Sequence, residues 1–258
     1  MVRSADDGAT PTGQAGHEEH AGPPSLGVSL KNVYETLAIS FPTMVDAVRG
    51  RVTKELCDRR LAHWAHRIVA DHTQLDVEVH GRENLVPGET YLVMSNHQSH
   101  YDIPVLFEVI GPNIRMITKE ELFRIPIFGN ALKLGGFISI DRGNRHAAIE
   151  SLERARELMA SGTHVWIAPE GTRSRTGELL PFKKGAFYLA LEAKLPILPV
   201  TIDGTRDALP ADDLRSRAGA HVKVTLHPKI DATPYAAKGK AGRDELMTEV
   251  RRVLGSAL

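Results

Sequence analysis

From residue 75 onward, short apolar runs alternate with stretches of helical spacing, and this alternation limits the fold more than any other feature of the sequence. The runs are LDVEVHG, TYLVMS, IRMITK, FISID, HVWIAP, ILPVTID and HVKVTLHP, and helical periodicity is clearest at 146–161, 185–194 and 242–254. Strands separated by helices predict an α/β domain. Runs as continuously apolar as YLVM suit a sheet that is covered on both faces. We therefore expect a mixed, largely parallel sheet flanked by helices over residues 72–258.

The chain before this domain divides into two parts. Residues 1–26 are rich in Gly, Pro, Ala and small polar residues, and a segment with so little apolar surface to bury is expected to be disordered. Residues 27–71 have apolar side chains at helical spacing, in two stripes. The first stripe is Val33, Tyr34, Leu37, Phe41, Met44, Val45 and Val48, and the second is Val52, Leu56, Leu61, Trp64, Ala65 and Ile68. Pro42 is expected to kink or divide the first stripe.

The amphipathic segment 27–71 has two interpretations. Its second half also presents a basic face, made of Arg49, Arg51, Lys54, Arg59, Arg60 and Arg67. Such a helix can lie in a membrane interface with Phe41 and Trp64 as anchors, or its stripes can pack on the rest of the domain. The sequence lacks a run of about 18 apolar residues, so we do not expect a spanning helix.

Composition excludes some classes of function. The 32 basic residues balance the 32 acidic ones, so no overall field favours nucleic acid, and we expect no nucleic-acid partner. A single cysteine, Cys57, excludes an intrachain disulfide and suits a reducing compartment.

A polar cluster interrupts the apolar pattern directly after the run YLVM. Its sequence is SNHQSHYD, and it contains His97 and Asp102. Ligands of open α/β sheets gather at the carboxyl ends of strands, and a carboxylate that accepts from one imidazole nitrogen makes the other a better base. His97 and Asp102 are therefore candidates for a general-base pair. The alternative is that Asp102 only caps a helix and His97 is a loop residue. Ser99 and His100 are weak candidates for a nucleophile and its base, because no Gly-x-Ser-x-Gly turn surrounds Ser99.

Further polar clusters end other apolar runs. PEGTRS follows HVWIA and contains Glu170, Gly171, Thr172 and Arg173; Arg142 follows FISID; Lys183 and Lys184 precede the helical stretch that starts near residue 185. Arginine donors match phosphate oxygens, and a glycine lets the backbone approach a ligand. Each cluster could be a solvated turn, but their shared position predicts an anion-binding pocket. Together with the His–Asp pair, it suggests proton abstraction beside a phosphate-bearing substrate.

These motifs resemble those of the glycerolipid acyltransferases, whose best-known members are the 1-acyl-sn-glycerol-3-phosphate acyltransferases. NHQSHYD is similar to the family's N-H-x4-D signature, GGFISIDR to its second motif, PEGTRS to its third and ILPVTIDGT to its fourth. The resemblance covers about residues 77–205. One departure is Ala168, which stands before the proline of the third motif where many members have an aromatic residue.

The resemblance implies a role for each matched residue. His97 would be the general base on a glycerol hydroxyl and Asp102 its orienting carboxylate, with no covalent acyl-enzyme. Phosphate would be held by Arg142 and Arg173, with Lys183 as a weaker candidate. The acceptor site would be shaped by Glu170, Gly171 and Thr172, and the acyl-chain wall supported by Pro199.

The resemblance also implies substrates and location. The co-substrate would be acyl-CoA or acyl-carrier protein, with no metal or redox cofactor, and the acceptor a lysophospholipid. Because the acceptor lives in a bilayer, the resemblance favours peripheral contact with the cytoplasmic face of a membrane through residues 27–71. Acyl-carrier protein is a further candidate partner.

Other functions remain open at this stage. The same motifs serve acceptors such as glycerol-3-phosphate, other lysophospholipids and lyso-ornithine lipids. A non-catalytic lipid-binding protein and a hydrolase in which His97 activates water are the alternatives from other classes.

Overall fold

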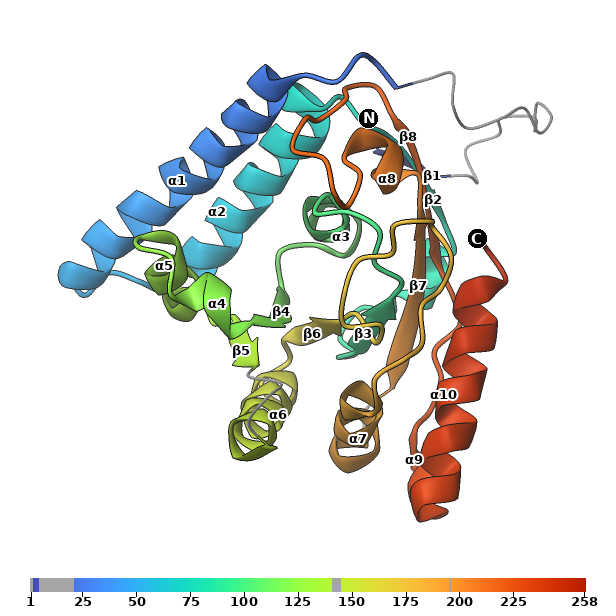
Figure 1. Cartoon of the computed structure of the whole chain (residues 1–258). Helices are drawn as coiled ribbons and strands as arrows, with labels where there is room; N and C mark the ends of the chain where they lie inside the picture. Colours follow the sequence, from blue (N-terminus) through green and yellow to red (C-terminus); the bar gives the residue numbers. More distant parts are fainter. Residues whose placement is uncertain (1, 5–20, 141–144, 195) are drawn as a thin grey trace.

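The computed structural model describes residues 2–4, 21–140, 145–194 and 196–258, and their strands form one sheet (Figure 1). Its eight described strands lie in the order β1-β2-β8-β7-β3-β6-β4-β5. All neighbouring pairs are parallel except β7 and β8, which are antiparallel. The strands are β1 (Val2–Ser4), β2 (Asp76–His80), β3 (Leu92–Ser95), β4 (Ile114–Lys119), β5 (Ile138–Ile140), β6 (His164–Ile167), β7 (Ile197–Asp203) and β8 (His221–Leu226). The expected mixed, largely parallel sheet is confirmed, and each predicted apolar run contains a strand.

Helices cover both faces of this sheet. The longer ones are α1 (Leu26–Val48), α2 (Lys54–His66), α3 (Asp102–Ile110), α5 (Phe128–Leu134), α6 (Arg145–Ala160), α7 (Lys184–Ala193) and α10 (Gly239–Gly255). The short ones are α4 (Glu120–Phe123), α8 (Thr205–Ala208), α9 (Thr233–Ala236), the π-helical turn η1 (Arg67–His72) and the 3-10 turn η2 (Arg82–Asn84). In Figure 1, α1, α2 and α3 lie on one side of the sheet and α6, α7 and α10 on the other.

The alternation of side chains along the central strands produces two apolar cores. On β3, Val93 joins the core under η1, α2 and α3, whereas Leu92 and Met94 join the core under α6, α7 and α10. Burial on both faces explains why this strand is apolar at almost every position. The polar residues that follow it therefore mark the point where the chain leaves the interior.

The apolar stripes of the two N-terminal helices face in opposite directions, one into the protein and one toward solvent. The stripe of α2 and η1 packs inward, and Leu61 and Ala65 of α2 and Ile68 of η1 belong to the core under this face. Trp64 also turns inward, because its indole N–H donates to the Thr36 hydroxyl at 3.0 Å and its ring meets Phe107 edge-on. The expectation that Trp64 is a membrane anchor is therefore wrong. The α1 stripe faces outward, and its exposed members are Val33, Tyr34, Leu37, Phe41 and Val48; Leu30, one turn before them, is exposed as well.

Pro42 does not divide the first helix. α1 begins at the cap Ser25, whose hydroxyl accepts from the Val28 N–H at 3.4 Å, and runs through Pro42 to Val48. A proline inside a helix removes one backbone donor and crowds the preceding turn, which can kink the helix without ending it. The helix is not divided at Pro42, and the alternative expectation of a kink stays a prediction. Within the described residues, we find no helix with the length and hydropathy needed to span a bilayer.

The structure departs from a fully disordered segment 1–26 at both of its ends. Val2–Ser4 form the edge strand β1 beside β2, and the Gly22 N–H donates to the Ala218 carbonyl at 2.7 Å. Ser25 forms a bridge to Ser216. Backbone pairing of this kind needs no large apolar side chain, so composition gave no sign of it. Residues 5–20 lie outside the described part of the chain.

Candidate active site

His97 and Asp102 lie at the carboxyl end of β3 and are in direct contact. The His97 Nδ1–H donates to Asp102 Oδ2 at 2.6 Å, and the Asp102 side chain is fully buried. A carboxylate is an acceptor only, so this bond places the ring proton on Nδ1 and leaves Nε2 with its lone pair. Among the described residues, no hydrogen bond engages Nε2. The pair thus has the geometry of a general base with its orienting carboxylate.

Four hydrogen bonds fix the Asp102 carboxylate. Besides the His97 ring, Oδ2 accepts from the backbone N–H groups of Gln98 at 2.8 Å and Ser99 at 3.1 Å. The fourth donor is the Thr205 hydroxyl, which donates to Oδ1 at 2.5 Å. Asp102 is the first residue of α3, but the N-cap is Tyr101 and its side chain makes no capping hydrogen bond, so the helix-cap alternative is wrong. The Asp102 carboxylate bonds the imidazole and the backbone of the loop before the helix instead.

A glycine places Thr205 where it can reach Asp102. Gly204 has a φ of +92°, and a Cβ there would lie 2.0 Å from the His221 carbonyl oxygen. Glycine accepts both this left-handed backbone and the close approach, so the chain can leave β7 tightly and turn into α8. This turn places the Thr205 hydroxyl beside the loop that follows the neighbouring strand β3, where it reaches Asp102.

Asn96 joins the end of β3 to β7. Its side-chain amide donates to the Ile202 carbonyl at 2.7 Å, and its oxygen accepts from the Ile202 N–H at 2.8 Å. Asn96 is buried, so both of its polar groups need partners in the protein. This two-way bond extends the ladder of the sheet by one side chain and fixes the start of the His97 loop.

Glu170 holds the third motif against the His97 loop. Its buried carboxylate accepts from the backbone N–H of His97 at 2.9 Å and from that of Leu180 at 2.8 Å. Burial raises the pKa of Glu170, and the two backbone bonds and the nearby His97 oppose the rise. A further bond runs from the Ser174 N–H to the His97 carbonyl at 2.7 Å. Glu170 is therefore a clamp between two loops in this structure, in addition to its expected place in an acceptor site.

Arg173 lies close enough to the His97–Asp102 pair to interact electrostatically with Asp102. Burial lowers the pKa of its guanidinium, while the charges of Asp102 and Asp212 raise it. Within the described residues, its guanidinium takes part in no hydrogen bond or ion pair. Gly171, with a φ of +73°, makes the turn that precedes it, and Thr172 is exposed on the same loop. A partly buried arginine with unused donors beside a base is suited to hold an anionic group.

The other two predicted phosphate contacts are Lys183 and Arg142. Lys183 caps α7, and its backbone N–H donates to the Pro169 carbonyl at 2.6 Å, while its side chain is exposed. The structure thus ties Lys183 to the third motif through its backbone. Arg142 lies outside the described residues.

His100 and Ser99 do not form a nucleophile and base. The Ser99 hydroxyl donates to the Leu209 carbonyl at 2.8 Å. Desolvation by the surrounding protein atoms lowers the pKa of His100 to about 4, with repulsion from Arg173 and His97 adding to the effect, although the residue keeps an exposed surface. His100 is therefore neutral at physiological pH and borders the cavity described next.

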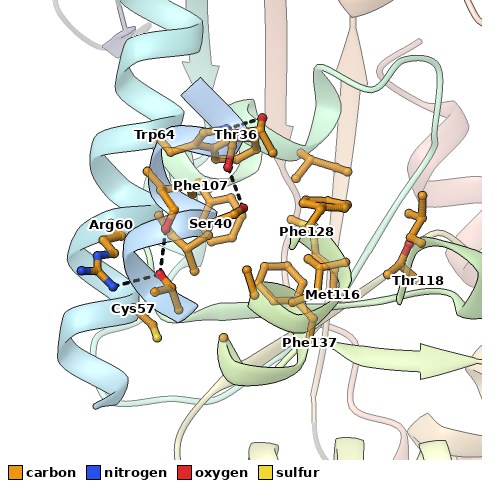
Figure 2. A pocket seen from close by; sticks show the side chains of 18 of the residues that line it. Thr36, Ser40, Cys57, Arg60, Trp64, Phe107, Met116, Thr118, Phe128 and Phe137 are labelled. Carbon is orange, nitrogen blue, oxygen red and sulfur yellow. Dashed lines mark hydrogen bonds between the residues drawn. The ribbon is translucent and has the colours of Figure 1, made fainter. Parts of the chain in front are cut away.

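The structure contains an apolar cavity of about 230 Å³ (Figure 2), which reaches the surroundings of the His97–Asp102 pair. The Trp166 side chain joins the two, because it lines the cavity and its ring meets the His97 ring edge-on, with centroids 5.5 Å apart. The cavity extends between α1 and α2 on one side and α3, β4, α4 and α5 on the other. Its lining includes Ile39, Ser40, Cys57, Leu61, Trp64, Phe107, Met116, Phe128, Leu132 and Phe137. Pro199 is not among the residues that line this cavity; it lies in β7, paired with Met94, and its expected support of an acyl-chain wall stays a prediction.

Comparisons with known proteins agree with this geometry. The model of the family named Acyltransferase matches residues 76–203, which contain β2 to β7 and the whole His–Asp loop. The chain is 35% identical to the 1-acyl-sn-glycerol-3-phosphate acyltransferase alpha of Mus musculus, over 72% of this chain and 65% of that protein. The chain belongs to the acyltransferase family. A second relative, the 1-acyl-sn-glycerol-3-phosphate acyltransferase of Saccharomyces cerevisiae, is also 35% identical, over 68% of this chain and 60% of that protein.

The fold is shared with a solved acyltransferase structure. The crystal structure of the 1-acyl-sn-glycerophosphate (LPA) acyltransferase PlsC from Thermotoga maritima has a TM-score of 0.74 and 27% identity, and the match covers 90% of this chain and 94% of that one. By contrast, the match spans about two thirds or less of the length of the mouse and yeast relatives. The family resemblance inferred from the motifs is confirmed.

The sequence interpretation missed two residues of this acyltransferase site. Thr205 and Asn96 stand at the ends of predicted strands, within or beside recognised motifs. Their partners, Asp102 and Ile202, could be identified only after β7 had been placed next to β3. The available signal was a polar residue directly after an apolar run. That signal does not show which other strand end the residue will contact in the folded protein.

Proposed function

We propose that this acyltransferase moves a fatty acyl group from acyl-CoA or acyl-carrier protein to the free hydroxyl of 1-acyl-glycerol-3-phosphate, giving phosphatidic acid. The observation that carries the proposal is the His97–Asp102 pair, whose imidazole ring contacts Trp166 in the lining of an apolar cavity. The base suits a hydroxyl nucleophile, and the cavity suits an acyl chain. The names of the relatives support the same reaction.

The step is a direct acyl transfer. Nε2 of His97 takes the proton of the glycerol hydroxyl as its oxygen attacks the thioester carbonyl carbon. The tetrahedral intermediate collapses with cleavage of the C–S bond, and the imidazolium returns its proton to the leaving thiolate. Asp102 holds the ring in the required tautomer and stabilises the imidazolium. The buried Trp166 beside the ring limits the access of water to the base.

Arg173 is our candidate for the acceptor's phosphate. Its donors are unused within the described residues, and it is close enough to Asp102 and His100 to influence their charges. Arg142 and Lys183 are proposed as further contacts to the phosphate or the donor, and Gly171 and Thr172 as the loop that closes over the acceptor. Arg173→Ala is expected to raise the KM for lysophosphatidic acid about tenfold or more and to leave the KM for the donor nearly unchanged. Arg156→Ala, on the exposed surface of α6, is the control.

The reaction is tested with purified protein, oleoyl-CoA and lysophosphatidic acid, by following thiol release and phosphatidic acid together. His97→Ala and Asp102→Asn are expected to lower kcat at least 100-fold. His80→Ala changes a half-exposed histidine on β2 and is the matched control. Thiol release that does not need an acceptor would point to a hydrolase. Transfer only to glycerol-3-phosphate, another lysophospholipid or a lyso-ornithine lipid would change the acceptor, and no transfer with either donor would contradict the proposal.

We further propose that the outer face of α1 contacts the cytoplasmic face of a membrane. Leu30, Val33, Tyr34 and Phe41 are each more than half exposed there, and a row of exposed apolar side chains on one helix face is typical of an interfacial helix. The turn between α4 and α5, with exposed Ile125 and Ile127, adds apolar surface next to α1. The cytoplasmic side follows from the proposed donors, which are cytoplasmic thioesters.

Vesicle flotation tests this contact. Phe41→Asp is expected to reduce binding to phospholipid vesicles severalfold, because a charge opposes burial in the interface. Val86→Asp, at an exposed apolar residue between β2 and β3, is the control. Equal binding by both variants and the wild type would exclude α1 as the contact.

A further inference from the structure

Tyr101 precedes the catalytic Asp102, yet the proposed reaction gives its hydroxyl no role. The side chain is 5% exposed, and its hydroxyl makes two short hydrogen bonds. It accepts from the Asn32 amide of α1 at 2.6 Å and donates to the Ser216 hydroxyl at 2.5 Å. Tyr101 therefore joins the start of α3 to an N-terminal helix and to a C-terminal loop.

The partners of Tyr101 are themselves fixed. Asn32 is buried on the inner face of α1, and its side-chain oxygen contacts His72 Nδ1 at 2.9 Å. Ser216 is buried as well, and its hydroxyl lies 2.8 Å from that of Ser29, which accepts from the Ser216 N–H at 2.9 Å. The hydroxyl of Tyr101 is thus the junction of a buried polar network that α1 supplies from outside the α/β domain.

The backbone end of Tyr101 leads to the catalytic carboxylate. Its N–H donates to the Ser99 hydroxyl at 3.2 Å, and the Ser99 N–H donates to Asp102 Oδ2 at 3.1 Å. Tyr101 is also the residue from which α3 begins. A shift of its ring would therefore displace both the first residue of α3 and the turn that holds Asp102.

We propose that Tyr101 is a positioning residue for the His97–Asp102 pair, and that α1 acts through Asn32 as part of the scaffold of the active site. In this view α1 contributes to catalysis even when no membrane is present. The activity readout of this inference rests on the proposed function, whereas its spectroscopic readout does not.

The test compares Tyr101→Phe, which keeps the ring and removes the hydroxyl, with Tyr188→Phe. Tyr188 is half-exposed on α7, and its hydroxyl accepts from Arg243 far from the pair in sequence. Assays use short-chain, water-soluble donor and acceptor without vesicles. Tyr101→Phe is expected to lower kcat about tenfold, the effect of one buried hydrogen bond, with both KM values unchanged. Tyr188→Phe is expected to keep the wild-type kcat.

A proton NMR measurement makes the inference independent of the reaction. The His97 Nδ1–H should give a low-field resonance, assigned by its loss in His97→Ala, that shifts or broadens in Tyr101→Phe and not in Tyr188→Phe. An unchanged resonance together with an unchanged kcat would overturn the positioning role. A wild type without acyl transfer would instead overturn the proposed function and leave the resonance as the test.

A double-mutant cycle with Asn32→Ala locates the coupling on α1. If α1 acts through Tyr101, the double variant should have nearly the same kcat as the more impaired single variant. Independent, multiplicative losses would show that Asn32 and Tyr101 do not act as a unit, and would overturn the role of α1.

Discussion

Helices α1 and α2 are neighbours with similar amphipathic sequences, but they bury opposite faces. α2 buries Cys57, Leu61 and Ala65, all of them apolar. α1 buries Asn32, Glu35, Ser40 and Thr43, and exposes most of its large apolar residues. An apolar stripe in the sequence therefore identifies the two faces of an amphipathic helix, but it does not show which face packs against the protein.

Polar contacts explain how α1 stays in place. Arg67, at the end of α2, donates to Glu35 at 3.0 and 3.1 Å, and Arg60 donates to the Thr43 hydroxyl at 2.9 Å and to Asp46 at 2.5 Å. Directional bonds of this kind can seat a helix without apolar packing, although each adds only about 1 kcal/mol. The arrangement leaves the apolar stripe of α1 available for another apolar phase.

The largest effect on stability is expected on the inner face of α2. Leu61→Ala removes a buried side chain that packs in the core and lines the cavity, and should lower the free energy of unfolding by about 2–3 kcal/mol. Urea denaturation followed by circular dichroism measures it. A loss below about 0.5 kcal/mol would mean that the α2 stripe contributes as little as an exposed one.

A smaller effect is expected on the inner face of α1. Glu35→Leu removes the acceptor of Arg67, and because Arg67 is 39% exposed, we expect a loss of only about 1 kcal/mol. If apolar packing held α1, the same change would stabilise the protein, so the sign decides. Glu153→Leu, which breaks an exposed pair with Arg156 on α6, is the control and should change little.

The contact between α1 and η1 should also be sensitive to acid. Burial lowers the pKa of His72 below its usual value of 6.5, while Glu35 raises it and Arg67 lowers it. The unfolded chain then binds a proton more readily than the folded one, so this histidine makes the protein less stable as the pH falls below about 6.5. Urea denaturation between about pH 7.5 and about pH 5.5 should show a shallower decline for His72→Gln than for the wild type. Parallel declines would show that His72 does not contribute.

Much of the fold was predictable because its signal is local. Each of the runs from LDVEVHG to HVKVTLHP became a strand, and burial on both faces of the central strands makes such runs visible. β1 escaped prediction, since an edge strand of three residues needs only backbone pairing with β2. The order of the strands also needs contacts between residues far apart in sequence, which one sequence does not reveal.

In the candidate active site, too, the local features were predictable and the long-range contacts were not. His97 and Asp102 were predicted as a pair because they stand five positions apart in one loop, and their contact is confirmed. One donor to the Asp102 carboxylate, Thr205, comes from the distant start of α8, and the Asn32 amide reaches the neighbouring Tyr101 from α1. No spacing in the sequence identifies the side chains of other elements that support such a pair, so only the structure reveals them.

The smallest effect on stability is expected on the outer face of α1, where the same change as on α2 can be made. Leu30→Ala should alter the free energy of unfolding by no more than about 0.5 kcal/mol, since Leu30 is 60% exposed. If the stripe enters a membrane, the lost methyl groups should weaken vesicle binding by about 1–2 kcal/mol, or roughly 5- to 30-fold. Urea denaturation and vesicle sedimentation of Leu30→Ala and Leu61→Ala give both quantities for one substitution on two helices. A stability loss at Leu30 equal to that at Leu61 would mean that the outer face of α1 is buried against protein in solution, and the contrast between the two helices would disappear.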